Sequence, residues 1–363
     1  MNQFKTAMNK LLTKRFGALI CSLLFISSVS FSQLDNVNFL RAGSLDGLKY
    51  AEKYITPWAN AFGASMNGGW YNTAKPHKLG GFDITTGVSF GFVPSSTTTF
   101  DVSKIGLSTL TGTGTASTIA GPNKEGPTLS ASSGGVTLTD FKTPPGTNWK
   151  MIPVPSAQIG IGLPFGTEVK ARFIPKISIA DGDISLWGVG LVHSIVQYFP
   201  GNKLLPFDIS LFCGYTKLQG NIPISLQPVL NAPGTYTTYN SATSFKDQKL
   251  SVDVSAMNVG VIGSLNLPVI TLYGGLGYSK TSTSFELKGN YPLPTVNPAI
   301  STTEAVYEDA GVVKNFPLVE IKNFSGVRAN IGLRIKLSVI TIHADYTRAQ
   351  YNVISTGLGI SFR

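Results

Sequence analysis

Residues 87–91, Gly-Val-Ser-Phe-Gly, have the spacing of a nucleophile elbow, which presents a serine for attack on an ester or amide. Such an elbow requires a sharp turn from a strand into a helix. Here apolar and polar residues alternate on both sides of Ser89, and this pattern predicts an uninterrupted strand. We therefore expect no catalytic serine at this position.

The three histidines, His77, His193 and His343, are scattered along the chain. His343 and Asp345 would point the same way on a strand, where they could form an acid–base pair. No nucleophile or water-activating partner accompanies them, so a structural hydrogen-bonded pair is the preferred interpretation. No metal-ligand spacing occurs either. The sequence predicts neither an enzyme nor a bound cofactor or metal.

The first 32 residues have the layout of a secretory signal peptide. Four basic residues and no acidic residue precede an apolar run that ends at Phe31, and small serines surround the expected cleavage point after Ser32. Removing these four from the 29 basic residues leaves 25 against 19 acidic residues, a net charge of +6. That excess is too diffuse to predict nucleic-acid binding. Only Cys213 remains, which excludes an internal disulfide.

Long stretches of alternating apolar and polar residues predict an all-β protein. In the stretch 320–337, for example, Ile331, Leu333 and Ile335 alternate with Arg334 and Lys336. Some of these strands run to about twenty residues, whereas strands of globular sheets usually have five or six. Aromatic residues gather near the strand ends and not on the apolar faces. These features indicate a transmembrane antiparallel β-barrel with a polar lumen and apolar side chains facing lipid.

The connections between the predicted strands alternate in length. Tight turns are expected at 164–166, 265–268 and 337–339, and long polar loops at 110–148, 221–246 and 288–317. Short periplasmic turns and longer outer loops alternate in this way in outer-membrane barrels.

The same alternation predicts the number of strands. Nine strands follow the loop 110–148, and a periplasmic N-terminus requires an odd number before it. Candidates near 63–73, 80–93 and 98–109 make about 12 strands in all. About 14 is the alternative, if the stretch 133–143 supplied spanning strands.

The chain ends on the amphipathic stretch STGLGISF, residues 355–362. This stretch resembles the C-terminal signal of bacterial outer-membrane barrels, which the barrel assembly machinery reads. Its elements would be the polar Ser355, Gly357, and the hydrophobic Ile360 and Phe362, although Arg363 stands last in place of an aromatic residue. A closed barrel also requires this last strand to pair with the first, because lipid tolerates no unsatisfied backbone.

Two stretches, GWYNTAKPHKLGGFDITTGVSFGFVP and VPSAQIGIGLPFGTEVKARFIPK, are similar to an uncharacterised family of Gram-negative outer-membrane barrels. The resemblance covers most of the mature chain and implies a location in the bacterial outer membrane, without an activity or functional residues. A fainter resemblance is to long-chain fatty acid transport barrels, which place a short helical hatch inside the pore. Their Asn-Pro-Ala motif lies near the N-terminus, whereas Asn297, Pro298 and Ala299 stand in a late loop here.

A short helix is expected before the barrel. Ser44 could be its N-cap, Leu48 and Ile55 belong to one apolar face, and Pro57 would end it. The predicted organisation is therefore a signal peptide (1–32), an N-terminal helical segment (33–62) and an outer-membrane β-barrel (63–363). The helix would either cap the periplasmic end or plug the lumen.

The predicted inward faces carry an excess of basic residues. The candidates for charged residues of the lumen are Glu168, Lys170, Arg172, Lys176, Glu320, Lys322, Arg328, Arg334, Lys336, His343 and Asp345. An open lumen lined in this way would weakly favour anions. The sequence therefore predicts an integral outer-membrane β-barrel that acts as a pore or transporter for small or hydrophobic solutes. The alternative is a closed structural or surface-interaction barrel that acts through its large outer loops, and the expected surroundings are outer-membrane lipid and lipopolysaccharide.

Overall fold

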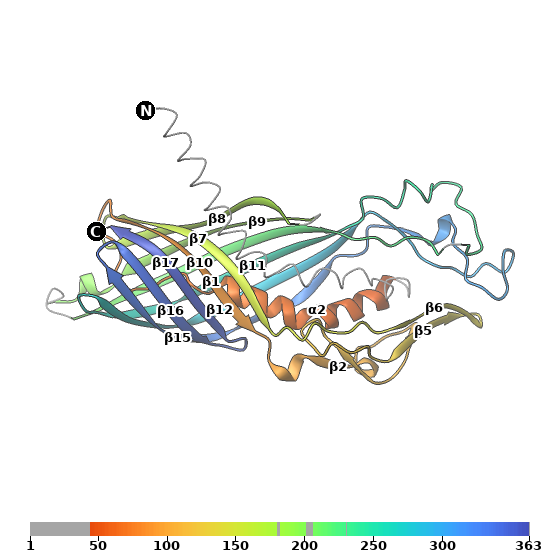
Figure 1. Cartoon of the computed structure of the whole chain (residues 1–363), viewed down its shortest axis with the longest axis horizontal. Helices are drawn as coiled ribbons and strands as arrows, with labels where there is room; N and C mark the ends of the chain where they lie inside the picture. The colour runs from red at the N-terminus through yellow and green to blue at the C-terminus, as the bar shows by residue number, and fades with distance from the viewer. Residues whose placement is uncertain (1–43, 180–181, 201–205, 230, 363) are drawn as a thin grey trace, which may run out of the picture.

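The computed structural model describes residues 44–179, 182–200, 206–229 and 231–362, and their main body is a closed barrel of ten strands (Figure 1). Each strand is antiparallel to both neighbours. In chain order the strands are β1 (Phe82–Phe92), β7 (Met151–Leu163), β8 (Thr167–Ile179), β9 (Gly182–Ser194), β10 (Phe207–Pro223), β11 (Lys249–Asn266), β12 (Ile270–Lys288), β15 (Val319–Leu337), β16 (Ile340–Arg348) and β17 (Val353–Phe362).

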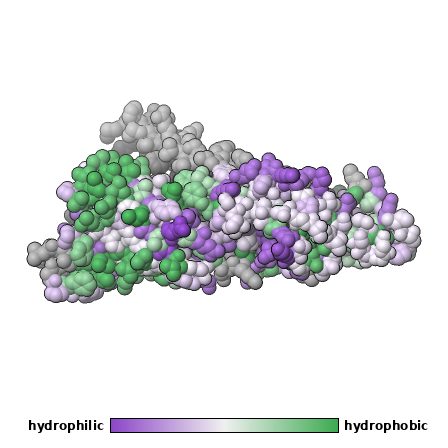
Figure 2. Space-filling model, turned by 90° about the horizontal axis from the view of Figure 1, so that it is seen from below, coloured by the Kyte–Doolittle hydropathy of each residue, from purple (hydrophilic) through white to green (hydrophobic). Residues whose placement is uncertain are grey.

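The alternation in the sequence becomes the two sides of the barrel wall. On β16, Thr341, His343 and Asp345 are buried toward the lumen, while Ile340 and Ile342 are exposed on the outside. Exposed outer side chains include Val327, of which 75% is accessible. Figure 2 shows that hydrophobic residues gather over the barrel half of the molecule and hydrophilic residues over the other half. The predicted apolar exterior and polar interior are confirmed.

The two ends of the barrel differ in the length of their connections. At one end, which we call the turn end, β1 begins, β17 ends, and short connections join β7 to β8, β11 to β12, and β15 to β16. At the opposite loop end, residues 93–150, 224–248 and 289–318 form three long connections. The predicted alternation of turn lengths is therefore present in the structure.

The barrel closes through β1 and β17, so the prediction that the last strand pairs with the first is confirmed. Phe82 lies opposite Phe362 in this register, and the centroids of their rings are 5.0 Å apart on the outer surface. Ile360 also faces outward, whereas Ser355 is buried toward the lumen and Gly357 lies beside His343. The residues of the predicted assembly signal thus lie on the strand that completes the ring.

The prediction of twelve strands is wrong by two. Nine strands follow the first long loop, as expected, but only β1 precedes it. The stretch 63–73 contains the end of a helix, and the stretch 98–109 contributes only the short strand β2 (Thr99–Asp101). The alternative of fourteen strands is wrong as well, because residues 133–143 lie largely in β6 (Val136–Lys142), which pairs with β5 (Thr128–Ser133) in a separate sheet at the loop end.

The N-terminal helix, α2 (Ser44–Met66), continues beyond Pro57, where the sequence predicted its end. Proline removes one helical hydrogen bond, and here the hydroxyl of Thr56 donates to the carbonyl of Glu52 at 2.5 Å in the same turn. The second half of the helix consists largely of small residues, and Ala61 is fully buried against the barrel. Trp58, Phe62 and Met66 form an apolar stripe along this half, and they pack in clusters with residues of the barrel wall. Close packing therefore stabilises the helical segment beyond Pro57.

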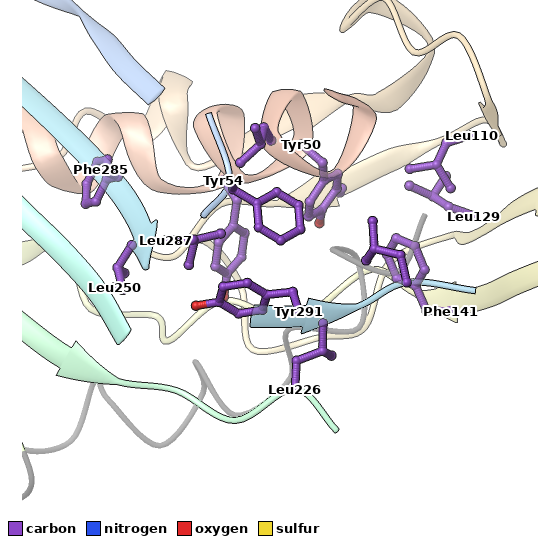
Figure 3. Packing of buried hydrophobic residues seen from close by; sticks show 14 of the residues in the cluster. Tyr50, Tyr54, Leu110, Leu129, Phe141, Leu226, Leu250, Phe285, Leu287 and Tyr291 are labelled. Carbon is purple, nitrogen blue, oxygen red and sulfur yellow. The ribbon is translucent and has the colours of Figure 1, made fainter. Parts of the chain in front are cut away.

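The long loops form a folded layer around the first half of α2 (Figure 3). We call this layer, built from residues 93–150, 224–229, 231–248 and 289–318, the loop layer. Tyr50 and Tyr54 of the helix pack with Phe141, Leu226 and Tyr291, so that all three loops share one apolar core. The loop layer also contains the short strands β2, β3 (Leu110–Thr111), β4 (Thr115–Ser117), β5, β6, β13 (Asn290–Pro292) and β14 (Val312–Lys314).

The seam between β1 and β17 generates a prediction about assembly. We expect Phe362→Asp to lower the amount of folded protein in the membrane strongly, because it removes a ring contact and places a charge on the outer face beside Phe82. The measurement is the heat-modifiable fraction in the membrane after expression. Phe165→Asp is the matched control, because Phe165 is 83% exposed in the β7–β8 turn with a left-handed φ of 58° that aspartate tolerates. Equal levels of the folded Phe362 variant and wild-type protein would contradict this role of the seam.

Candidate functional site

The lumen contains the chain itself. We call residues 44–81, which comprise α2 and the stretch that leads to β1, the plug. Its helix contacts β7, β1 and β17 on one side and β11, β12 and β15 on the other, so it lies inside the ring of strands. At the turn end, Gly80 donates a backbone hydrogen bond to Gly162 of β7 at 3.2 Å. Of the two placements considered for the N-terminal helix, the contacts are those of a plug in the lumen.

The plug is attached to the loop layer by a buried aspartate. Asp46, which is 1% exposed, lies in the first turn of α2 and accepts backbone hydrogen bonds from Ser108, Thr109 and Leu110 at 2.6–2.9 Å. Burial raises the pKa of this carboxyl, but the hydrogen bonds outweigh burial and hold the pKa well below its usual range. A carboxylate at this position also complements the positive end of the helix dipole.

Two arginines of the barrel wall satisfy the C-terminal end of α2. Arg172 of β8 donates to the carbonyls of Met66 and Gly68 at 3.0 and 2.7 Å, and Arg328 of β15 donates to the carbonyl of Asn67 at 2.7 Å. We call this pair the arginine clamp. The last turn of the helix contains no basic residue of its own. The wall therefore supplies the positive charge that the unpaired carbonyls at a helix C-terminus favour.

An aromatic pair holds the stretch after the helix. The guanidinium of Arg172 lies 3.8 Å from the ring centroid of Trp70, and the hydroxyl of Tyr71 donates to the side chain of Asn330 at 2.8 Å. The indole lies against Gly190 and Gly214, where an added Cβ would come within 2.8 and 2.7 Å of neighbouring side-chain atoms. These two glycines therefore make the room that the aromatic ring occupies.

Near the turn end, the plug is bonded to the wall on several sides. The hydroxyl of Ser210 donates to the carbonyl of Ala74, and the backbone N–H of Ala74 donates to the hydroxyl of Ser264 at 3.0 Å. Asn72 lies within 3.4 Å of the His343 imidazole on the other side of the lumen. Polar contacts thus connect the plug to β10, β11 and β16, in addition to the strands that carry the arginine clamp.

A compact ionic cluster joins His77 of the plug to the wall. The backbone N–H and Nδ1 of His77 lie 2.9 and 2.8 Å from Oε2 of Glu168, and the Lys170 ammonium lies 2.5 Å from the other carboxylate oxygen. Asp83 completes the cluster at 3.5 Å from the same ammonium. His77, Asp83 and Glu168 offer ligand atoms within 4.8 Å of one another, as a metal site requires. The lysine cation that already contacts both carboxylates makes the cluster an ion-pair network instead.

Most of the predicted lumen charges lie where the alternation placed them. Glu168, Lys170, Arg172, Arg328, Arg334, His343 and Asp345 are buried inside the barrel, and Lys336 is half-buried. The plug brings several of them together, since Arg172 and Arg328 meet at the helix end. Ser89 of the Gly-Val-Ser-Phe-Gly stretch also faces the lumen, within the uninterrupted strand β1 and 3.0 Å from the Ser355 hydroxyl.

Two predicted lumen residues lie elsewhere because β-bulges shift the alternation. The register of β8 shifts between Ile174 and Ile177, and the side chain of Lys176 is 69% exposed and pairs with Asp183. The pairing of β15 with β12 shifts as well, so that Ile321 is buried and Glu320 is exposed. Glu320 and Lys176 are therefore not lumen residues, and the side chain of Lys322 lies outside the described part of the structure.

Sequence reasoning missed Asp46 and the plug residue His77, together with Asp83. Asp83 is the first inward residue of β1, and its alternation with Phe82 and Ile84 was a usable signal. No comparable signal marks His77, because the stretch 67–81 has no regular secondary structure. His77 joins the ionic cluster only because the plug extends to the turn end of the lumen.

A family model described as "Family of unknown function (DUF6588)" matches residues 8–362. The chain belongs to this family. The expectation of an uncharacterised family is confirmed to this extent, and the fainter resemblance to fatty acid transport barrels stays a prediction. A search of curated proteins found no match.

Among solved structures, the chain is similar to several outer-membrane proteins. With Ail, the attachment invasion locus protein of Yersinia pestis, the identity is 8%, the coverage 78% of this chain and 98% of the other, and the TM-score 0.26. With the translocator domain of the autotransporter NalP from Neisseria meningitidis, the identity is 11%, the coverage 83% of this chain and 93% of the other, and the TM-score 0.30. With the toluene transporter TbuX of Ralstonia pickettii, the identity is 8%, the coverage 85% of this chain and 93% of the other, and the TM-score 0.22.

The arginine clamp predicts local mobility when it is removed. We expect Arg172→Gln combined with Arg328→Gln to accelerate amide hydrogen exchange of residues 59–66 by about tenfold or more, because hydrogen bonds to a charged group contribute roughly 1.5–3 kcal/mol each. The matched control is Lys176→Gln, which removes an exposed cation from the same strand as Arg172. Unchanged exchange in a folded double variant would show that the clamp does not hold the helix.

The Asp46 anchor predicts a dependence on pH. Because the folded pKa of Asp46 lies below the ordinary value of 3.8, the stability that the anchor contributes is complete above that value. It decreases as the pH falls below 3.8 and is lost once the pH has passed the depressed folded pKa. We expect acid to release residues 44–54 from the loop layer, measured by protease sensitivity. Asp46→Asn should be sensitive already at neutral pH and lose this pH dependence, and an identical acid profile in both proteins would contradict the assignment.

Proposed function

We propose that the protein is an integral outer-membrane barrel whose lumen is closed by its own plug and whose loop layer acts at the cell surface. The observation that carries this proposal is the plug itself, which is bonded to the wall from the loop layer to the turn end. A permanently open pore does not fit a lumen through which a helix and the further residues 67–81 of the same chain run.

The membrane location rests on the exterior of the barrel. Closure of the ring leaves no strand edge without a partner, as a hydrocarbon environment demands. The outer faces carry aliphatic side chains with large exposed fractions, such as Leu276 at 68% and Ile331 at 70%. No α-helix of the described residues combines the length and apolar character needed to cross a bilayer. The signal peptide, residues 1–32, lies outside the described residues and remains an expectation from the sequence.

The proposed surface role rests on the loop layer. Its three loops share a core with α2, and Asp309 of the third loop accepts backbone hydrogen bonds from Thr237 and Thr238 of the second loop. Loops that are folded against one another present a defined surface, which a binding function requires. The ordered layer supports recognition of a partner outside the cell more directly than it supports passage of a solute.

A plug-gated transporter is the second candidate, and one observation favours it. The wall around the plug is lined with buried charged residues, among them Lys170, Arg172 and Arg328, where a purely structural lumen could be apolar. The plug is also attached by hydrogen bonds and ion pairs that water or a solute could replace. If the plug moves, the lumen becomes polar, with more basic than acidic groups along its wall.

A crosslink between plug and wall distinguishes the two candidates. A Cβ at Gly69 would lie 3.8 Å from the Cβ of Ser355, a separation within the roughly 3.5–4.5 Å that a disulfide bridges. We propose Gly69→Cys with Ser355→Cys in a Cys213→Ser background, which removes the native thiol. For a closed surface barrel, we expect little conductance in planar bilayers and no difference between the oxidised and reduced forms.

The reduced form of the same variant is the matched control, because it carries the same strain at the left-handed Gly69 (φ +65°). Conductance or solute uptake that appears in the reduced form and disappears on oxidation would establish the transporter and overturn the closed barrel. Large conductance in both forms would contradict both candidates.

A further inference from the structure

Three nitrogen atoms converge on one hydroxyl oxygen at the turn end of the lumen. Oγ of Ser361 lies 3.2 Å from Nη2 of Arg334 and 3.3 Å from Nζ of Lys336. Nε2 of His77, the plug residue, lies 3.0 Å from the same oxygen. The hydroxyl can accept from both cations while it donates to the imidazole. The two positively charged groups therefore share a neutral hydroxyl oxygen as their acceptor.

These two cations lack an acidic partner within the described residues. No carboxylate of that part of the chain lies within 4.0 Å of Arg334 or Lys336. Asp83 and Glu168 act on the Arg334 guanidinium only from beyond 4.0 Å, and both already contact the Lys170 ammonium. Arg334 is only 7% exposed, and its buried Nε has no hydrogen-bond partner among the described residues. A buried guanidinium in this state is costly unless an anion compensates it.

The two side chains differ in access to solvent. Arg334 is buried, whereas Lys336 is half-buried and lies one residue before the end of β15, beside the short turn to β16. The backbone N–H of Lys336 donates to the carbonyl of Val269 at 2.8 Å, so the neighbouring turn fixes its position. A small anion could therefore reach the arginine from the turn end, past the lysine.

We propose that Arg334, Lys336 and Ser361 form a binding site for an oxyanion at the turn end of the lumen. The guanidinium supplies the planar donors that match phosphate or carboxylate oxygens, and the ammonium supplies a second, more mobile charge. The shared chemistry is a phosphate or carboxylate group, either on a free solute or on a lipid headgroup. The site requires only the folded barrel, so it goes beyond the proposed surface function and does not rest on it.

A bound oxyanion would also act on the plug. His77 contacts Ser361 through one ring nitrogen and Glu168 through the other, so it connects the proposed site to the ionic cluster. When the imidazole carries both protons, Nδ1–H donates to Glu168 and Nε2–H can donate to the oxyanion, which adds a contact between plug and wall. Occupancy of the site therefore strengthens closure of the lumen at the turn end.

The experiment is a calorimetric titration of the folded wild-type protein, in detergent and phosphate-free buffer, with inorganic phosphate. We expect saturable binding, weakened about tenfold or more by Lys336→Gln and abolished by Arg334→Gln, because each change removes a charge-assisted contact. Lys176→Gln, which removes an exposed cation near the opposite end, should leave binding unchanged. If Arg334→Gln does not fold, Lys336→Gln still decides, because Lys336 is half-buried near the end of β15 and its replacement should leave the fold intact.

A parallel titration with a short-chain phosphatidylglycerol separates the two sources of the oxyanion. Binding of phosphate supports a site for a free solute, and binding of the lipid alone assigns the site to a headgroup. Binding of neither ligand to the folded wild-type protein overturns the proposal, as does equal affinity of wild-type protein and Lys336→Gln. Because this assay needs no open lumen, its failure leaves the outcome of the crosslinking experiment unaffected.

Discussion

The arrangement of this molecule depends on how the end of a helix is satisfied inside a barrel. A helix leaves its last carbonyls without partners, and a protein lumen offers far less solvation than open water. Here the guanidinium groups of Arg172 and Arg328 approach the same helix end from β8 and β15. Burying a guanidinium costs free energy, and so does burying a helix carbonyl that has no partner. The same hydrogen bonds offset both costs, because each carbonyl carries partial negative charge.

The fit between plug and wall reinforces this arrangement. A Cβ at Gly91 of β1 would lie 2.3 Å from the carbonyl oxygen of Ala61, so this wall position accepts only glycine while the helix is in place. A Cβ at Gly63 of the helix would lie 2.9 Å from side-chain atoms of Thr281 of β12. The backbone of the helix therefore approaches the wall on two sides, and the closed lumen is specified by small residues as well as by charges.

Much of the wall could be predicted from the sequence, because a strand facing lipid and lumen must alternate at every residue. This rule identified the nine barrel strands that follow the first long loop, and the inward position of Arg172 and Arg334. The rule failed where the chain is not a regular strand. A bulge breaks the alternation before Lys176, and the helix beyond Pro57 owes its stability to contacts with the wall. The arginine clamp was beyond prediction, because its acceptors are backbone carbonyls that no residue type reveals.

The close approach of Gly91 to Ala61 has a consequence for the order of assembly. A helix whose backbone touches the surrounding strands cannot slide through a finished ring past inward side chains such as Arg172 and Arg328. The ring must therefore form around the plug, with β17, made last, closing against β1 after the helix has taken its place. The plug therefore acts as a template: the first part of the chain sets the width of the lumen that the later strands enclose.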